Sequence, residues 1–273
     1  MTTSAIRPDV VPRSPHRDVA FPRLARAELL KLRRRRGLMA FAAVPTIVPM
    51  VIGYGVTLFL HATDAAHHGP AGGISNLAGS LNVLALLGGV AAILIGSTAG
   101  AGDLGAGVFR ELVVTGRSRT ALYAARIPAG LAVLFAFLTS AFAFAALASV
   151  MFAGSSRSPD PSLILASAGW VAVTAATSFA VALGVSSLLG SRSMSIGILL
   201  GWQLALANLL LAFSFLGVTR EALLPAGVAR LTPGRLDLGS QVTMSVAAAA
   251  AVILGWTIVA LVAGGWRTVT RDA

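Results

Sequence analysis

Four side chains that could bind a metal ion lie close together, at His61, Asp64, His67 and His68. Imidazole nitrogens and carboxylate oxygens at helical spacing can hold Zn²⁺. The surrounding stretch is rich in Gly and Ala and brings no further ligand, so we expect a solvated loop and no metal site. Cysteine is absent from the chain, which excludes disulfides, cysteine-bound zinc and thiol catalysis.

A second stretch has the spacing of a nucleotide-binding loop. Residues 100–105 read Gly-Ala-Gly-Asp-Leu-Gly, which matches G-x-G-x-x-G. A dinucleotide site also needs a strand before this motif and an acidic residue about twenty positions later, whereas an apolar run precedes it and residues 121–126 hold no acid. The motifs G-x-x-x-x-G-K-[ST], G-x-S-x-G and H-E-x-x-H are absent. We therefore expect no enzyme activity and no cofactor, and interpret the glycines as a flexible end of the apolar run.

Several charged residues lie together between residues 103 and 126, with apolar runs on both sides. Leu104, Val108 and Leu112 recur every four residues, which predicts a helix with one apolar side. Gly116 can end that helix, and Ser118 can cap the next one. We expect this helix-turn-helix to dock a soluble partner, and a solvated loop that only sets topology remains the alternative. The expected docking residues are Asp103, Leu104, Val108, Arg110, Glu111, Leu112, Arg117 and Arg119.

The composition indicates where these segments lie. Hydrophobic residues make up 56% of the chain and charged residues only 11%, against about 25% in a typical soluble domain. Mean hydropathy is +0.83. The sequence therefore predicts an all-α integral membrane protein. The Ala, Gly, Leu and Val that fill the apolar runs suit close packing of transmembrane helices.

Six apolar runs reach or nearly reach the ~20 residues needed to cross a bilayer. They cover residues 38–60, 81–99, 127–153, 163–189, 195–218 and 242–265. Pro45 and Pro49 should bend the first run, and Pro128 lies at the start of the third. We expect a disordered tail over 1–22, a basic connecting helix over 23–37, a six-span domain over 38–267 and a short tail over 268–273. The leucines of the connecting helix do not gather on one clean face, so we expect weak amphipathicity.

The positive charges are distributed unevenly about these runs. With the N-terminus in the cytoplasm, 17 of the 21 Lys and Arg residues fall on the cytoplasmic side, so both termini are expected there. Arg33 to Arg36 stand directly before the first run, where they fit anionic lipid better than nucleic acid. No charged residue lies deep inside a span as drawn, so a site for proton or ion coupling is not expected.

Neutral polar groups are the only polar side chains within the spans. They can join helices by hydrogen bonds or line a pathway, and both interpretations stay open. The candidate pathway residues are Asn82, Thr174, Thr177, Gln203 and Asn208, with Ser178 beside them.

The last outer segment, residues 219–241, is predicted to be a broken hairpin. Thr219 can cap a short helix over 220–224, Pro225 should break it, and an apolar stretch follows before Pro233-Gly234. Broken helices at membrane depth are tolerated where they are buried in protein or line a cavity.

Three segments together resemble the permeases of type-2 ABC transporters. They are the opening RAELLKLRRRRGL, the loop GDLGAGVFRELVVTGRSRTALYAARI with its Thr-Gly-x-Ser-Arg element at residues 115–119, and the broken segment TREALLPAGVARLTPG. The resemblance covers residues 23 to 267 through short, degenerate motifs.

This resemblance implies six spans in a bacterial cell membrane, a cytoplasmic coupling helix and a second permease copy or paralogue. It also implies a separate ATP-binding subunit, which would hold ATP and Mg²⁺, and export of drugs, lipids, polysaccharides or peptides. Two other functions stay open: a non-transporting scaffold or regulatory anchor for a cytoplasmic partner, and a self-contained carrier that uses the neutral polar groups.

Overall fold

The computed structural model describes residues 21–105, 107, 118–235 and 244–270, and every regular element among them is helical. Five of these helices and one continuous helical segment, Arg192–Ala212, are long and apolar enough to cross a membrane, which confirms the predicted class of a multi-pass, all-α membrane protein. Residues 1–20 of the expected disordered tail and most of the expected docking loop lie outside the described residues, and the last two residues of that tail, Phe21 and Pro22, begin the first helix.

The elements follow in chain order. The first half consists of α1 (Phe21–Arg34), α2 (Arg36–Thr63), α3 (Ile74–Gly105) and α5 (Arg119–Met151). The second half begins with α6 (Pro161–Leu189), α7 (Arg192–Gly201), a π-helical turn (Trp202–Leu206) and α8 (Ala207–Ala212). It ends with a 3₁₀ segment (Ser214–Ala222), α9 (Leu224–Arg230), a 3₁₀ turn (Pro233–Arg235) and α10 (Val246–Thr270).

Local sequence explains several of these boundaries. The Ser118 hydroxyl accepts a hydrogen bond from Ala121 N at 3.4 Å, which confirms the predicted cap of α5. The Asp160 carboxylate caps α6 by accepting from Leu163 N at 2.8 Å, and Pro161 follows in the first helical turn. This backbone bond, with a second from the Ser162 hydroxyl, lowers the pKa of Asp160 below its usual value. Gly190 ends α6 in the left-handed conformation with φ 70°.

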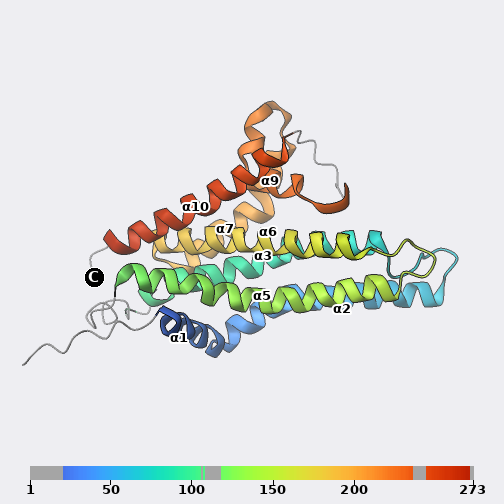
Figure 1. Ribbon diagram of the computed structural model, residues 1–273, viewed down its shortest axis with the longest axis horizontal. Coiled ribbons are helices and arrows are strands. Elements are labelled where there is room, and N and C mark those ends of the chain that lie inside the picture. Colours follow the sequence, from blue (N-terminus) through green and yellow to red (C-terminus); the bar gives the residue numbers. More distant parts are fainter. Residues whose placement is uncertain (1–20, 106, 108–117, 236–243, 271–273) are drawn as a thin grey trace, which may run out of the picture.

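Four long helices, α2, α3, α5 and α6, run side by side along the long axis of the molecule, and α10 crosses α6 obliquely (Figure 1). The turns after α2 and α5 lie together at one end of the bundle (Figure 1). We call it the 64–73 end. The opposite end, which we call the α1 end, carries α1 and the last turns of α10 (Figure 1).

Small residues allow the central helices to approach closely. A Cβ on Gly100 of α3 would overlap the Ser186 hydroxyl of α6 and lie 2.6 Å from the Leu183 carbonyl oxygen. The motif at residues 100–105 thus continues α3 and packs on α6, so the expected flexible end of the span was wrong. On the other side of α6, a Cβ on Gly184 would overlap the carbonyl of Ala260 in α10.

Gly184→Ala should lower stability by about 1–3 kcal/mol, because the added methyl group forces α6 and α10 apart. Gly169→Ala on the same helix is the control, since its Cβ meets nothing within 4 Å. That change should leave stability equal or higher, because Ala favours helix over Gly by about 1 kcal/mol. Thermal unfolding of both variants in one detergent measures the difference. Equal thermal unfolding midpoints for the two variants would contradict the close α6–α10 contact.

Four expectations about element boundaries need correction. Helices α3 and α5 extend past the predicted spans, so Pro128 lies inside α5 and Asp103 and Arg126 lie within helices. The fifth span ends at Ala212 because the chain turns into a 3₁₀ segment. Pro225 stands in the first turn of α9, so it begins a helix and does not break one. The basic helix ends at Arg34, before a kink at Arg35 with ψ 80°.

Candidate functional site

A buried acid at the α1 end holds three elements together. Asp103, in the last turn of α3, accepts hydrogen bonds from Lys31 Nζ of α1 at 2.8 and 2.9 Å. Its Oδ2 also accepts from Nη2 of Arg126 in α5 at 3.0 Å. Lys31 pairs in turn with Glu28 at 2.8 Å. We call these four residues the Asp103 cluster.

The Asp103 cluster is withdrawn from solvent. The side chains of Asp103 and Arg126 are 8% and 2% exposed, and Lys31 at the rim is 35% exposed. Arg126 also donates from Nη1 to the Gly100 carbonyl at 3.0 Å, while its buried Nε has no partner among the described residues. Because the carboxylate already has two cationic partners, it joins helices and offers no free acid or base. Whether Asp103 also takes part in docking a partner stays a prediction.

The same geometry places a buried ion pair near the ends of α3 and α5, just outside the runs in which no deep charge was expected. Hydropathy falls at Asp103 and Arg126, and the predicted runs accordingly stopped before them. The helices nevertheless continue through both residues, and the two charges pair with each other within the bundle.

Apolar packing reinforces the attachment of α1. Leu24 is buried against Leu122 and Ala125 of α5, and Leu32 belongs to the main core. The half-buried and buried residues of α1 form one face, with Ala25, Glu28, Leu29 and Lys31 among them. The expected weak amphipathicity was wrong, because Leu24, Leu29 and Leu32 lie on this face while the arginines of α1 are exposed.

Two further bonds tie α10 to the start of α5. Arg119 donates to the Val269 carbonyl at 3.0 Å, and the Tyr123 hydroxyl donates to the Leu261 carbonyl at 3.1 Å. Arg119, expected in the docking set, thus lies where α5 meets the end of α10. The described ends of α3 and α5 flank residues 108–117, and α1 and α10 are bonded to these two helices.

The other expected docking residues are described only in part or not at all. Leu104 lies in the last turn of α3, and nothing is described of its side chain. The remaining ones, Val108, Arg110, Glu111, Leu112 and Arg117, lie outside the described residues. Their role in docking stays a prediction.

The neutral polar residues bind mostly to their own helices. Asn82 and Thr177 donate to carbonyls one turn earlier, at 3.0 and 2.9 Å, and Thr174 accepts from Ser178 through its backbone carbonyl at 3.0 Å. Thr177 also accepts from Thr257 of α10 at 3.5 Å. The structure does not gather these residues into one site, and their part in a pathway stays untested.

Gln203 and Asn208 do come together, at a feature that the sequence did not predict. The π-helical turn Trp202–Leu206 lies between α7 and α8, and Asn208 donates to the backbone carbonyl of Gln203 at 3.3 Å. Gln203 itself donates to the Leu86 carbonyl of α3 at 2.9 Å. Such single π-helical turns often occur at functional sites.

The cluster of possible metal ligands is an exposed turn. His67 Nδ1 lies 2.8 Å from Asp64 Oδ2, and His61 Nδ1 lies 2.8 Å from the backbone oxygen of His68. Within the described part of the chain, no group of three or more His, Cys, Asp or Glu side chains could hold a metal ion.

Two polar clusters were not predicted from the sequence. Arg126 was expected in a loop, although the acid that it binds is only 23 positions earlier. Tyr54, Ser80 and Ser149 were not expected to meet, yet their hydroxyls form a chain of hydrogen bonds at 3.0 and 2.6 Å between α2, α3 and α5. Isolated hydroxyls in apolar spans carry no periodic signal, so only the fold reveals this second cluster.

Comparison with protein-family models and with curated proteins gave no match for this chain.

Proposed function

We propose that this chain is a permease subunit of an ATP-driven exporter in a bacterial cell membrane. It forms the substrate pathway with a second permease, either an identical copy or a paralogue. A separate ATP-binding subunit supplies the energy and binds ATP and Mg²⁺. The multi-pass helical architecture, the absence of a nucleotide-hydrolysis motif from the sequence and the resemblance to type-2 ABC permeases support this proposal.

The Asp103 cluster is the observation that carries the proposal. It bonds α1 to the ends of α3 and α5, which lead directly into and out of residues 106–117. A coupling helix within that segment would therefore be linked to two long spans and to the basic helix. A conformational change that a cytoplasmic ATPase imposes on this segment would therefore be transmitted to α1, α3 and α5 together. Such a permease needs this transmission to couple ATP hydrolysis to transport.

We place the α1 end in the cytoplasm, because most Lys and Arg residues are on that side. Since the chain has no cysteine, single substitutions Ser118→Cys and Ser155→Cys can be labelled without background. Both positions are exposed. We expect a membrane-impermeant maleimide to label Ser155→Cys from outside intact cells, and Ser118→Cys only after the membrane is opened. Labelling of both from outside would contradict the orientation.

We further propose that α9 and its flanking 3₁₀ segments form a re-entrant hairpin on the outer side. Trp170 donates from Nε1 to the Val228 carbonyl of α9 at 2.9 Å. Trp170 lies nine residues from the start of α6, or about 14 Å along its axis, so α9 contacts α6 well below the 64–73 end. Trp256 of α10 bonds the Ala222 carbonyl at 3.0 Å, which satisfies a backbone group that lipid would leave unpaired.

A non-transporting scaffold would have the same structural features as the proposed exporter and would differ from it in its use of ATP. A scaffold would bind its partner without ATP hydrolysis, whereas an exporter requires a nucleotide-hydrolysing subunit. Copurification of the tagged chain from its native membrane, with identification of bound proteins, tests the proposal. A self-contained carrier would instead transport without any captured ATPase.

A further inference from the structure

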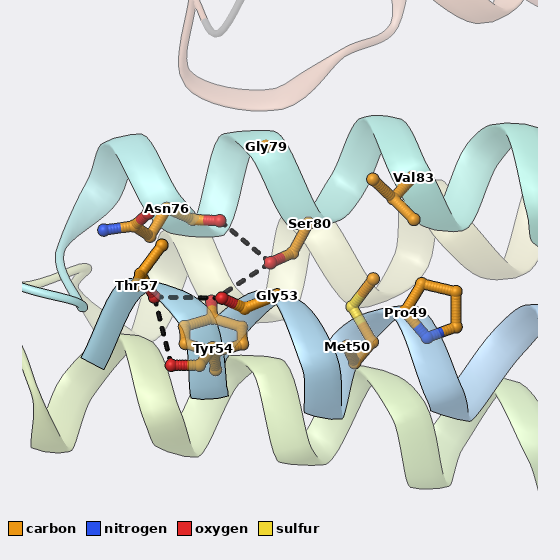
Figure 2. A pocket seen from close by; sticks show the side chains of 9 residues that line it. All are labelled: Pro49, Met50, Gly53, Tyr54, Thr57, Asn76, Gly79, Ser80 and Val83. Atoms are coloured by element: carbon orange, nitrogen blue, oxygen red, sulfur yellow. Dashed lines mark hydrogen bonds between the residues drawn. The ribbon is translucent and has the colours of Figure 1, made fainter. Parts of the chain in front are cut away.

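A small pocket opens between α2 and α3 in the half of the bundle towards the 64–73 end (Figure 2). Its volume is about 150 Å³. Both walls come from helices that the chain uses as membrane spans, so the pocket lies at the level of one leaflet.

The polar groups of the pocket are held in place by hydrogen bonds. The Ser80 hydroxyl contacts the Tyr54 hydroxyl at 3.0 Å and the Asn76 carbonyl at 2.8 Å (Figure 2). The Tyr54 hydroxyl also lies 2.6 Å from the Ser149 hydroxyl of α5, so the buried tyrosine is fixed from two sides. Asn76 donates both amide hydrogens to the carbonyls of Pro70 and Gly72, at 3.1 and 2.8 Å. The Asn76 Oδ1 thus keeps its capacity to accept a hydrogen bond.

The lining changes from polar to apolar along the axis of α2. Thr57 and Tyr54 lie nearer to the 64–73 end, and Met50 and Pro49 lie deeper. Pro49 is fourteen residues before the last residue of α2, or about 21 Å along the axis, towards the bilayer centre. A molecule with a polar head at the leaflet surface and an apolar chain below it fits this order.

Two glycines keep the pocket open. A Cβ on Gly53 of α2 or on Gly79 of α3 would meet no atom within 4 Å. Both residues line the pocket and both are exposed. The neighbouring Ile52 and Val56 of α2 are 58% and 50% exposed, as expected for a face that contacts lipid. A lipid can therefore enter from the side.

The chemistry of the lining selects the head group. None of the described residues that line the pocket carries a charge, so a phosphate or carboxylate buried here would lack a partner. The Asn76 amide oxygen and the Thr57 hydroxyl oxygen can accept hydrogen bonds, because the Thr57 hydrogen is directed at the Gly53 and Tyr54 carbonyls. Uncharged hydrogen-bond acceptors of this kind suit a lipid head group that donates a hydrogen bond from a hydroxyl.

We propose that this pocket binds an uncharged lipid that bears a free hydroxyl, such as a diacylglycerol, from the adjoining leaflet. The hydroxyl bonds at the level of Asn76 and Thr57, and the upper part of one acyl chain lies against Met50, Pro49 and Val83. The rest of the molecule stays in the bilayer, since the pocket is smaller than a whole lipid. This inference does not depend on the proposed exporter function.

Photocrosslinking of the full chain in phosphatidylcholine vesicles tests the site. The probe is a diacylglycerol with a diazirine near the start of one acyl chain. We expect crosslinks in residues 49–57 and 76–83, mapped by mass spectrometry. Unlabelled dioleoylglycerol should compete, and dioleoyl phosphatidic acid, with the same chains and a charged head, should not. Equal competition by both lipids would overturn the head-group assignment.

Gly53→Leu and Gly79→Leu should each reduce the crosslinking yield about tenfold, because the added side chain fills the pocket. Gly55→Leu is the matched control, since Gly55 also has open space around it but does not line the pocket. Thermal unfolding of the three variants checks that each is folded, and one folded pocket variant is sufficient for the comparison. Equal yields in wild type, control and pocket variants would overturn the proposal. So would the absence of crosslinks in wild type, the result expected if a second copy of the chain covered the pocket.

Discussion

Asp103→Asn should destabilise the protein by about 3–5 kcal/mol, the usual cost of removing one partner from a buried ion pair. The substitution conserves the shape of the side chain and removes only its charge. Arg126, 2% exposed and already short of one partner at Nε, would then be a buried cation without an anion. Lys31 would lose less stabilising interaction energy than Arg126, because its side chain is 35% exposed and keeps its ion pair with Glu28.

A double-mutant cycle separates this effect from a general packing defect. Arg126→Met removes the buried cation and leaves Asp103 with Lys31, so the double variant Asp103→Asn/Arg126→Met should be more stable than the sum of the single effects predicts. We expect a coupling energy of at least about 1 kcal/mol from denaturant titrations in detergent. Lys31→Met serves as the exposed comparison and should cost about 1 kcal/mol or less. Additive single effects would show that the Asp103–Arg126 bond contributes nothing specific.

Glu111→Arg should weaken capture of the ATP-binding subunit at least about tenfold, or about 1.4 kcal/mol. Charge at the rim of an interface decides partner choice, and a reversed charge is repelled where the native one is attracted. An acid has little influence on topology, so a loop that only sets topology would tolerate the change. Insertion and expression should therefore stay normal, while ATPase coupling falls.

Asp64→Arg is the matched control for this substitution. It makes the same change of charge in an exposed turn at the opposite end of the bundle. Pull-down of the ATPase and its stimulated activity, measured on the same reconstituted sample, should be normal in the control and reduced in Glu111→Arg. Equal capture by both variants would remove Glu111 from the docking surface.

The spans could be predicted from the sequence because bilayer thickness imposes their length and apolar character. Each of the six apolar runs lies largely within one helix or one continuous helical segment. The Ser118 cap was also predictable, since its chemistry is local. The π-helical turn at Trp202 carries no local signal and was not predictable. The helix that begins near Pro225 was missed although proline in a first helical turn is a local start signal.

The candidate site was predicted only in outline. Low hydropathy led to the prediction that Asp103 and Arg126 lie in a loop, although both lie within helices and pair with each other. The face of α1 could have been predicted from the sequence, because Leu24, Leu29 and Leu32 share one side of the helix. The contact of Lys31 with Asp103, 72 positions along the chain, could not.

The most direct test of the exporter proposal is ATP hydrolysis by material purified through a tag on this chain from its native membrane. We expect a second protein with a G-x-x-x-x-G-K-[ST] loop in the purified complex, and hydrolysis that disappears when the lysine of that loop is replaced. The same activity should fall when the tagged chain carries Glu111→Arg. A chain that purifies in folded form, with its partners retained and with no nucleotide-hydrolysing protein among them, would contradict the proposed function.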